Sequence, residues 1–504
     1  FLNKRGKHIR IAEEDAMIKK FDFEKAAKDN PFLNAKRSDQ ANELAELQRA
    51  CIERNLPVLI IIDGWESAGK GYTIKQLVRE LDARHFKVDV FEAEDADAPL
   101  HPYSWRFWTR IPARGDFAIF DRSFYYRVMN DPDIQGKKLK TALKHFERVE
   151  KMLTDDGMLI LKFFLNVTEK TQRERIQELL KDENRDVLIS KNDQEQNAHY
   201  KKYRDHFDEI LEMTNLPFSP WWVIAAEDKK AASRQILGIT IQEIRKQIQS
   251  HTDASEQSEP AFSRSYGKAP EILQKLRTDL VLSDEEYDQA VGGLQDEADE
   301  LLFALYARRI PSIMVFEGMD AAGKGGAIQR LTQGMDPRLY EINPTAAPSD
   351  PEKDHHYLWR FYTNFPTRGR MAVFDRSWYG RVMVERVEGF AKPEEWERAY
   401  DEINAMEEEL TDFGALVLKF FLYIDSQEQL ERFRERETDK PYKLTEEDWR
   451  NREKWDDYVE AMNEMIDRTS PPSAPWVLVE GNDKRFARVK VLESFIRAAK
   501  ARLK

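Results

Sequence analysis

The chain has 504 residues, which is too long for one ordinary hydrophobic core and predicts at least two domains. Hydrophobic residues make up 41% and charged residues 34%, as in a globular protein with a charged surface, and no run approaches the roughly 18 apolar residues of a membrane helix. The formal charge of −13 argues against a nucleic-acid coat protein, so neither nucleic acid nor a membrane is an expected partner. The single cysteine, Cys51, excludes an intramolecular disulfide and a cysteine-based zinc site, and the cytoplasm is the expected location.

Long blocks of the sequence occur twice. The pairs are Asp63–Gly71 with Glu317–Gly325, Ser104–Gly115 with Leu358–Gly369, and Ile119–Arg127 with Val373–Arg381. All three pairs share an offset of 254 residues, as between Lys70 and Lys324. A constant register over so many blocks indicates a duplicated domain.

In chain order, this gives a first domain, a linker and a second domain. The first domain is assigned to residues 1–248. Residues 250–260, rich in Ser, Glu, Asp and Gln, predict a flexible linker, assigned to 249–270. The second domain, 271–504, opens with a helical pattern from Glu271 to Arg309, in which Ser283 is the expected N-cap of a helix.

Each copy alternates short apolar runs with longer helical patterns. In the second copy the apolar runs are Ser312–Glu317, Leu339–Ile342, Met371–Asp375, Ala415–Ile424 and Trp476–Glu480. Unbroken apolar runs are expected of strands that are buried on both faces. The pattern predicts two α/β domains, each a parallel sheet of about five strands between layers of helices.

A phosphate-binding loop is predicted directly after the first of these strands. Residues 318–324 have the spacing G-x-x-x-x-G-K and precede a helical stretch at Ala327–Gln333. Glycines let backbone N–H groups converge on phosphate oxygens, and the lysine ammonium reaches the terminal phosphates. The spacing alone is a weak signal, but two copies between a strand and a helix make it a strong one.

The usual Ser or Thr after the loop lysine, whose hydroxyl holds Mg²⁺, is replaced by Gly325, and by Gly71 in the first copy. Asp320 lies in the loop and Asp375 ends the third apolar run, so both carboxylates are expected at the carboxyl edge of the sheet. Together they predict a Mg²⁺ site. The alternative for Asp375 is a helix cap.

Arginines close to these carboxylates are predicted to hold phosphate. Arg360 and Arg376 are candidates because a guanidinium matches phosphate geometry, while Trp359 is as readily explained by packing. A basic stretch between the fourth and fifth strands, with Arg432 and Arg436 at i,i+4 spacing, occupies the position of a kinase lid. A solvated helical face is the ordinary alternative for such a charge run.

The first copy keeps only part of this set. It retains Lys70, Arg106, Asp121 and Arg122, but Glu66 replaces the loop aspartate, and Glu195 and Asn197 replace Arg450 and Arg452 of the lid. We therefore expect the first copy to retain phosphate binding at most, without efficient transfer.

These blocks, read together with the lid sequence from Glu431 to Tyr458, resemble the polyphosphate kinase 2 family, and the doubled chain is similar to its two-domain class that accepts AMP. The resemblance implies P-loop kinase-like domains with a helical lid and transfer of the terminal phosphate of polyphosphate to AMP, giving ADP, with Mg²⁺ or, as a substitute, Mn²⁺. It implies catalytic roles for Asp320, Lys324, Asp375 and Arg376, and metal binding by Asp320 and Asp375. The phosphate-binding residues that it implies are Gly318, Ala321, Ala322, Gly323, Gly325, Gly326, Arg360, Arg381, Arg432, Arg436, Lys440, Lys443, Arg450 and Arg452.

Three alternatives stay open: an ATP-dependent nucleoside monophosphate kinase, a polyphosphate-dependent kinase acting on nucleoside diphosphates, and a regulator that only binds polyphosphate. The P-loop and lid alone do not separate the first two from the leading hypothesis. The retained Asp320, Asp375 and lid argue against the third. A homo-oligomer is also left open, because a tandem pair imitates a dimer of single domains.

Overall fold

The computed structural model describes residues 17–91, 100–181, 189–256, 269–439 and 446–504. The chain divides into two compact units, Phe1–Asp95 with Phe107–Glu259, and Ala96–Arg106 with Pro260–Lys504. Each unit contains one five-stranded sheet in which all the strand pairs are parallel. The duplicated α/β architecture is confirmed.

The sheet of the first unit has the strand order β2-β3-β1-β4-β5. The elements of the first copy are α1 (Phe23–Lys28), α2 (Arg37–Glu53), β1 (Val58–Gly64), α3 (Lys70–Leu77), the 3-10 helix η2 (Ala83–His85), β2 (Phe86–Val90), α4 (Trp105–Trp108), β3 (Phe117–Asp121), α5 (Tyr126–Met129), α6 (Gly136–Asp155), β4 (Leu159–Asn166), α7 (Glu169–Leu180), α8 (Lys191–Ala198), α9 (Tyr200–Thr214), β5 (Trp221–Ala225) and α10 (Lys229–Glu256). Helices α3 and α10 pack on the sheet and on each other, while α6 contacts β4 and α9.

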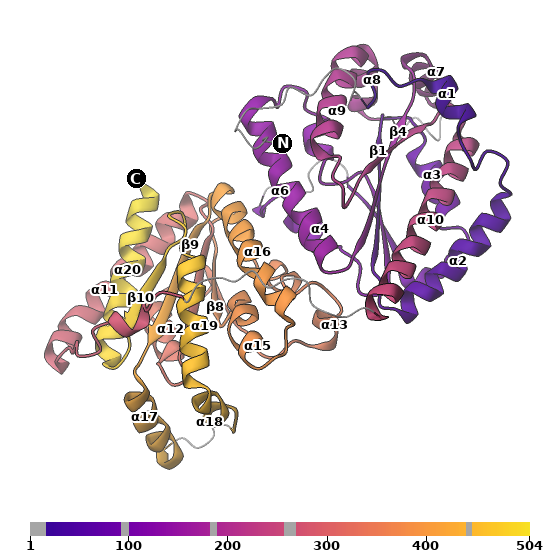
Figure 1. Ribbon diagram of the computed structural model, residues 1–504. Coiled ribbons are helices and arrows are strands. Elements are labelled where there is room, and N and C mark those ends of the chain that lie inside the picture. The colour runs from indigo at the N-terminus through magenta and orange to yellow at the C-terminus, as the bar shows by residue number, and fades with distance from the viewer. Residues whose placement is uncertain (1–16, 92–99, 182–188, 257–268, 440–445) are drawn as a thin grey trace, which may run out of the picture. The chain divides into compact units, whose positions relative to one another are not determined.

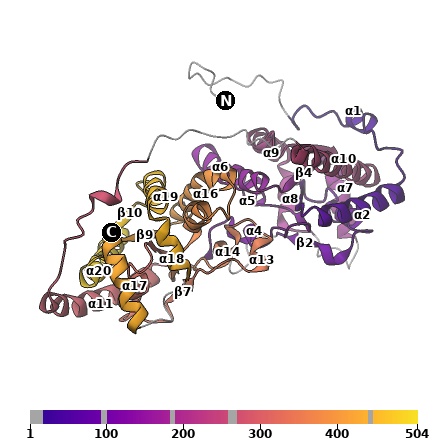
Figure 2. The same ribbon diagram turned by 60° about the horizontal axis from the view of Figure 1, so that its bottom comes forward.

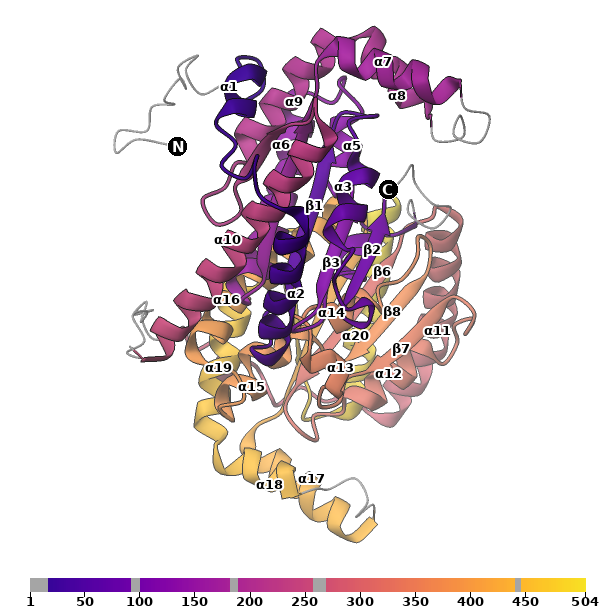
Figure 3. The same ribbon diagram turned by 90° about the vertical axis from the view of Figure 1, so that its right-hand side faces the viewer.

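The sheet of the second unit repeats this order as β7-β8-β6-β9-β10. Its elements are η5 (Leu273–Lys275), α11 (Asp284–Ala307), β6 (Ser312–Gly318), α12 (Lys324–Thr332), β7 (Tyr340–Pro344), α13 (Asp350–Lys353), α14 (Trp359–Tyr362), β8 (Met371–Asp375), η6 (Trp378–Val382), α15 (Val384–Val387), α16 (Pro393–Asp412), β9 (Leu416–Tyr423), α17 (Ser426–Asp439), α18 (Glu446–Glu453), α19 (Trp455–Arg468), β10 (Trp476–Glu480) and α20 (Lys484–Leu503). The sheet separates α11 and α12 from α16 and α19 (Figure 3).

Apolar strands form the centre of each unit. Every residue from Leu416 to Tyr423 in β9 is buried, and β6 is buried up to its last residue. Helix α20 packs against β9 and β10 and runs beside α11 (Figure 2). Helix α11 begins at the predicted cap, where Ser283 and Glu286 form a capping box. Among the helices in the described residues, none is both long and apolar enough to cross a membrane.

The predicted linker begins inside a helix. Helix α10 continues to Glu256, beyond the predicted domain end at residue 248. The Ser, Glu, Asp and Gln content predicted a flexible segment, but residues 249–256 include no Gly or Pro that would end a helix. Residues 257–268 of the predicted linker lie outside the described residues.

Parallel strands bring the functional loops to one edge of the second sheet. Strands β6 and β8 are neighbours, and their carboxyl ends lead into the P-loop and into Asp375 respectively. Helices α17 and α18 lie at one end of this sheet (Figure 1). The carboxyl edge of an open α/β sheet is where ligands of such folds bind.

Candidate active site

The second P-loop packs tightly against the neighbouring strand. Gly318 has a φ of 142°, and a Cβ at this position would lie 2.1 Å from the carbonyl oxygen of Leu422. Only glycine allows such a close approach with this backbone conformation. Gly323, with a φ of 100°, precedes α12, so the loop ends at a helix N-terminus whose N–H groups suit an anion.

Lys324 begins α12 and folds back over the loop. Its Nζ donates hydrogen bonds to the carbonyl oxygens of Gly318, at 2.8 Å, and Met319, at 3.2 Å. Burial lowers the pKa of Lys324, while the nearby carboxylate of Asp320 acts in the opposite direction. Within the described residues, Lys324 has no ion pair with a carboxylate, so its charge is available to a phosphate.

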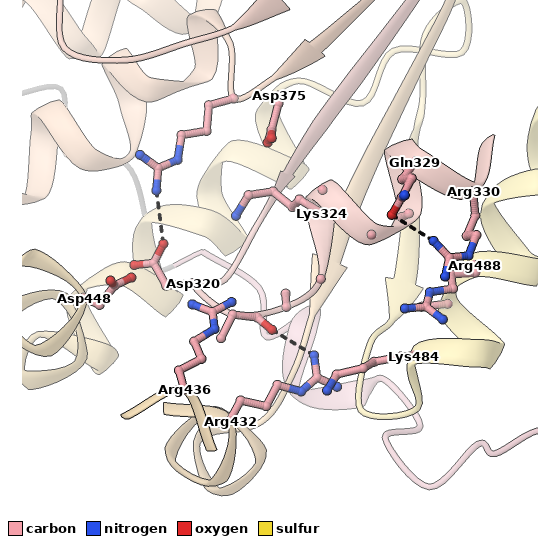
Figure 4. Close-up of a pocket in the computed structure, with 18 of the residues that line it drawn as sticks. Asp320, Lys324, Gln329, Arg330, Asp375, Arg432, Arg436, Asp448, Lys484 and Arg488 are labelled. Atoms are coloured by element: carbon pink, nitrogen blue, oxygen red, sulfur yellow. Dashed lines mark hydrogen bonds and ion pairs between the residues drawn. The ribbon is translucent and has the colours of Figure 1, made fainter. Parts of the chain in front are cut away.

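The two predicted metal-binding carboxylates both lie near this lysine (Figure 4). Asp320 Oδ2 accepts a hydrogen bond of 2.9 Å from Asn451 of α18, and Arg376 Nη2 lies 3.4 Å from Asp320 Oδ1. Asp375 ends β8, and Arg376 follows it with a φ of 64°. A non-glycine residue in this region of backbone space is uncommon and is often found at functional sites.

A cavity of about 950 Å³ lies above the loop and joins all these groups (Figure 4). Its lining comes from the P-loop, α12, the ends of β7 and β8, α17, α18 and α20. The lining includes five acidic side chains, namely Asp320, Asp375, Glu435, Asp439 and Asp448, and six arginine and lysine side chains beyond Lys324, namely Arg330, Arg376, Arg432, Arg436, Lys484 and Arg488. A concave, strongly charged site of this kind suits a polyanion together with a cation.

Comparison with known proteins agrees with this geometry. The model of the polyphosphate kinase 2 family matches residues 27–252 and 281–504. The chain belongs to the polyphosphate kinase 2 family.

Similarity extends along nearly the whole chain. The polyphosphate:AMP phosphotransferase of Pseudomonas aeruginosa is 40% identical over 457 residues, which cover 90% of this chain and 92% of the relative. The polyphosphate:AMP phosphotransferase of Acinetobacter johnsonii is 33% identical and covers 88% of this chain and 91% of its own length. The crystal structure of a putative polyphosphate kinase 2 from Pseudomonas aeruginosa PA01 aligns with a TM-score of 0.81 at 37% identity, over 95% of this chain and 96% of that one.

In this polyphosphate kinase 2 family member, the structure brings most of the predicted loop and carboxylate residues together. The predicted residues that line the cavity are Asp320, Ala321, Ala322, Gly323, Lys324, Gly325, Gly326, Asp375, Arg376, Arg432 and Arg436. Gly318 lies beneath the loop and contributes its carbonyl oxygen to Lys324. Lys440 and Lys443 lie outside the described residues.

Four predicted phosphate-binding arginines are not placed in the cavity. Arg360 lies 3.1 Å from Glu352, and Arg381 lies 3.2 Å from Glu385, with its guanidinium over the ring of Tyr357. Arg450 forms an ion pair of 3.2 Å with Glu388. Arg452 donates to the carbonyl oxygen of Ser426 and to Gln429 Oε1. These four arginines bind carboxylates or carbonyl oxygens of the protein itself. The sequence pattern alone does not reveal those partners.

Arg432 lines the cavity but also makes several contacts within the protein. Its side chain is buried and donates to the carbonyl oxygens of Ala321, Gly481 and Asn482. Arg175 makes the matching bonds in the first unit, to Ala68, Ala226 and Glu227. Both copies therefore use an arginine to connect the P-loop to the segment that follows the last strand of the sheet.

Sequence analysis missed three cations of the cavity, Arg330, Lys484 and Arg488. Arg330 lies on α12 beyond the loop motif, and the other two lie on α20, far along the chain. A residue-by-residue comparison of the two copies could have identified the two arginines, because Gln76 and Ser233 stand at the matching positions.

The first P-loop has a similar backbone but a different network of charges. Glu66 is buried and forms ion pairs of 3.0 Å with both Lys70 and Arg122. The lysine and arginine that were expected to hold phosphate are therefore already bound to a carboxylate. Asp121 ends β3 at the position that matches Asp375, and Arg106 is buried in a segment that belongs to the second unit.

The residues of the second site fit a Mg²⁺ ion. In the described part of the chain, no group of three or more His, Cys, Asp or Glu side chains could hold a metal by itself. Mg²⁺ commonly uses one or two carboxylates and completes its octahedron with water and substrate phosphates. Two aspartates in a cavity that would also receive phosphate agree with that preference.

Proposed function

We propose that the chain transfers the terminal phosphate of inorganic polyphosphate to AMP, forming ADP, and that the second unit performs this reaction. The observation that carries the proposal is that full-length relatives named polyphosphate:AMP phosphotransferase match about nine tenths of the chain. The assignment to the second unit is supported by Lys324, which has no carboxylate partner among the described residues, whereas Lys70 is bound to Glu66.

The reaction needs no covalent intermediate with the protein. A phosphate oxygen of AMP attacks the terminal phosphorus of the chain, the new P–O bond forms, and the bridging P–O bond breaks. The shortened polyphosphate leaves with the electron pair of that bond. Positioning of the two phosphates and neutralisation of their charge account for the rate of such transfers.

Each part of the cavity has a role in this transfer. The P-loop N–H groups and Lys324 would hold the terminal phosphate of the donor. Asp320 and Asp375 would hold Mg²⁺, which supplies charge neutralisation on the transferred phosphate. Arg376 and Arg436, which line the same cavity, would hold the acceptor phosphate and the charge that moves during transfer.

The test is ADP formation from AMP and long-chain polyphosphate, with Mg²⁺ and without ATP, in the wild type and in Lys324→Ala. We expect turnover in the wild type and a loss of at least about 100-fold in the variant. Turnover only when ATP replaces polyphosphate would identify a nucleoside monophosphate kinase. Binding of polyphosphate without any product would identify a regulator instead.

A further inference from the structure

A buried carboxylate lies directly behind the second P-loop. Glu317 is the residue of β6 before Gly318, and it is 3% exposed. Ser377, which follows Asp375 and Arg376 in the chain, is equally buried, and its hydroxyl donates a hydrogen bond of 2.8 Å to Glu317 Oε1. Neither Glu317 nor Ser377 is among the described residues that line the cavity, and the proposed transfer does not use them.

Glu317 is a carboxylate without a paired cation. Within the described residues, no lysine or arginine forms an ion pair with it, and its printed hydrogen bond comes from Ser377. Burial raises the pKa of Glu317 to about 7, although the charge of Lys324 and the hydrogen bond from Ser377 act in the opposite direction. Burial of an acid in this way is costly, so the position needs a compensating role.

The hydrogen bond from Ser377 joins β6 to the turn that carries Asp375 and Arg376. Arg376 has a φ of 64°, and a non-glycine residue in this conformation is strained and persists only where surrounding contacts hold it. The backbone N–H of Arg376 donates to the carbonyl oxygen of Phe316 at 3.1 Å, one residue before Glu317. One backbone bond and one side-chain bond therefore hold this turn against the strand that leads into the P-loop.

The first copy repeats this arrangement with a shorter acid. Ser123 donates its hydroxyl hydrogen bond to the buried Asp63. Arg122, which precedes Ser123, has a φ of 67°, and its N–H donates to the carbonyl oxygen of Ile62 at 3.0 Å. The two copies differ in the charges of their P-loops, yet each keeps both the buried acid and the strained arginine. This correspondence indicates that the conformation of the turn depends on the acid.

From this geometry we infer that Glu317 is a positioning residue for phosphoryl transfer, which acts through Ser377 to hold Asp375 and Arg376 in their working orientation. The inference rests on the proposed function, because it takes Asp375 and Arg376 to act on the reacting phosphates. Without the hydrogen bond from Ser377, the strained turn can relax and move both side chains. A displacement of about 1 Å at a reacting group can cost about 100-fold in rate.

The test is steady-state phosphorylation of AMP by the full chain carrying Glu317→Ala, Ser377→Ala or both changes. Each single change should lower kcat about 10-fold to 100-fold. The KM values for polyphosphate and AMP should change less than about threefold, because neither residue lines the cavity. The double variant should be no slower than the slower single variant, since both changes remove the same hydrogen bond.

A conservative variant separates positioning from simple loss of packing. Glu317→Gln keeps the length of the side chain and an oxygen that accepts from Ser377, so its kcat should be several-fold higher than that of Glu317→Ala. Denaturant titration shows whether each variant is folded under the assay conditions. Ser377→Ala removes only one oxygen atom, and it tests the same hydrogen bond if Glu317→Ala does not fold.

The first copy supplies matched controls. Asp63→Ala and Ser123→Ala break the corresponding hydrogen bond in the first unit. Both changes should destabilise that unit as their counterparts destabilise the second unit, but they should leave kcat unchanged.

The outcomes separate this inference from the proposed function. If the wild type forms no ADP from polyphosphate, the proposed function fails and the inference fails with it. If the wild type is active but folded Ser377→Ala and Glu317→Ala keep the wild-type kcat, Glu317 does not position the turn. Equal losses of kcat in the variants of the two copies, or a double variant that multiplies the two single losses, would also overturn the inference.

Discussion

The two P-loops of this chain show how one side chain decides whether such a loop is open to phosphate. Glu66 reaches both Lys70 and Arg122, while Asp320, one methylene shorter, reaches Arg376 at 3.4 Å and Asn451 at 2.9 Å and has no ion pair with Lys324 within the described residues. Lys70 and Lys324 both donate to two carbonyl oxygens of their loops, and within the described residues only Lys70 also binds a carboxylate. The carboxylate of Glu66 thus neutralises two cations that would otherwise be available to a phosphate.

The lid helices of the two units, α8 and α18, also differ in their hydrogen bonds with the P-loop. In the first unit, Gln196 of α8 accepts a hydrogen bond of 2.9 Å from the N–H of Glu66, and Asp193 accepts one of 2.6 Å from Ser67. In the second unit, Ala321 replaces Ser67, and the N–H of Asp320 makes no hydrogen bond within the described residues. The first lid helix therefore binds a backbone N–H of its loop, whereas the second, through Asn451, binds the carboxylate of Asp320 and leaves that N–H for a ligand.

The largest effect is expected from breaking the ion pairs of the first loop. Glu66→Ala leaves the buried Lys70 and the partly buried Arg122 without their carboxylate, which should cost about 3–5 kcal/mol of the free energy of unfolding of the first unit. Asp320→Ala should cost less than about 1 kcal/mol, because its partner Arg376 is exposed. Denaturant titration measures both, and equal losses would contradict the proposed difference between the loops.

A nearly equal effect on activity is expected at the ends of β8 and β3. Asp375→Asn should lower kcat for AMP phosphorylation about 100-fold to 1000-fold, or about 3–4 kcal/mol, because it weakens electrostatic stabilisation of the transferred phosphate. Asp121→Asn should change kcat less than about twofold, since Lys70 is bound to Glu66. If Asp121→Asn alone abolished turnover, the reaction would belong to the first unit.

The two loops should also respond differently to acid. Burial alone would raise the pKa of Glu66, but Lys70 and Arg122 outweigh it and lower the pKa to about 2. A lowered pKa adds stability above the ordinary value of 4.5, and this stability is lost as the pH falls toward 2. The difference in unfolding free energy between wild type and Glu66→Gln should therefore shrink by up to about 3 kcal/mol over this range. If the difference in unfolding free energy between wild type and Glu66→Gln did not change with pH, the charge of Glu66 would not contribute to stability.

Comparison of the two loops also shows what the sequence could predict. The strands Met371–Asp375 and Trp476–Glu480 have the predicted bounds, because strands buried on both faces require unbroken apolar runs. The P-loop was predictable because Gly318 approaches the backbone of β9 closely and Gly323 has a φ of 100°, and both situations favour glycine. Asp320 and Asp375 could be placed at one edge because parallel strands end together.

Partners of the arginines were not predictable in the same way. Arg432 and Arg436 share one helical face, yet Arg432 is buried against three backbone carbonyl oxygens. Arg450 belongs to the same basic stretch but pairs with Glu388, far from it in sequence. Which acceptor an arginine finds depends on the packing of elements that are distant in sequence, and a charge pattern does not contain that information.

The smallest expected effect tests this difference within the lid. Arg450→Ala removes a half-exposed ion pair with Glu388 outside the cavity, so it should cost about 0.5 kcal/mol of stability and change kcat/KM less than about twofold. Arg436→Ala removes a cation that lines the cavity and should lower kcat/KM about tenfold. Steady-state assays at two salt concentrations measure kcat/KM for both variants. Only the loss from Arg436→Ala should change with salt, because only that loss should depend on donor affinity. An equal loss in both variants would mean that the whole basic stretch closes on the substrate, and that the ion pair of Arg450 is exchanged for phosphate during turnover.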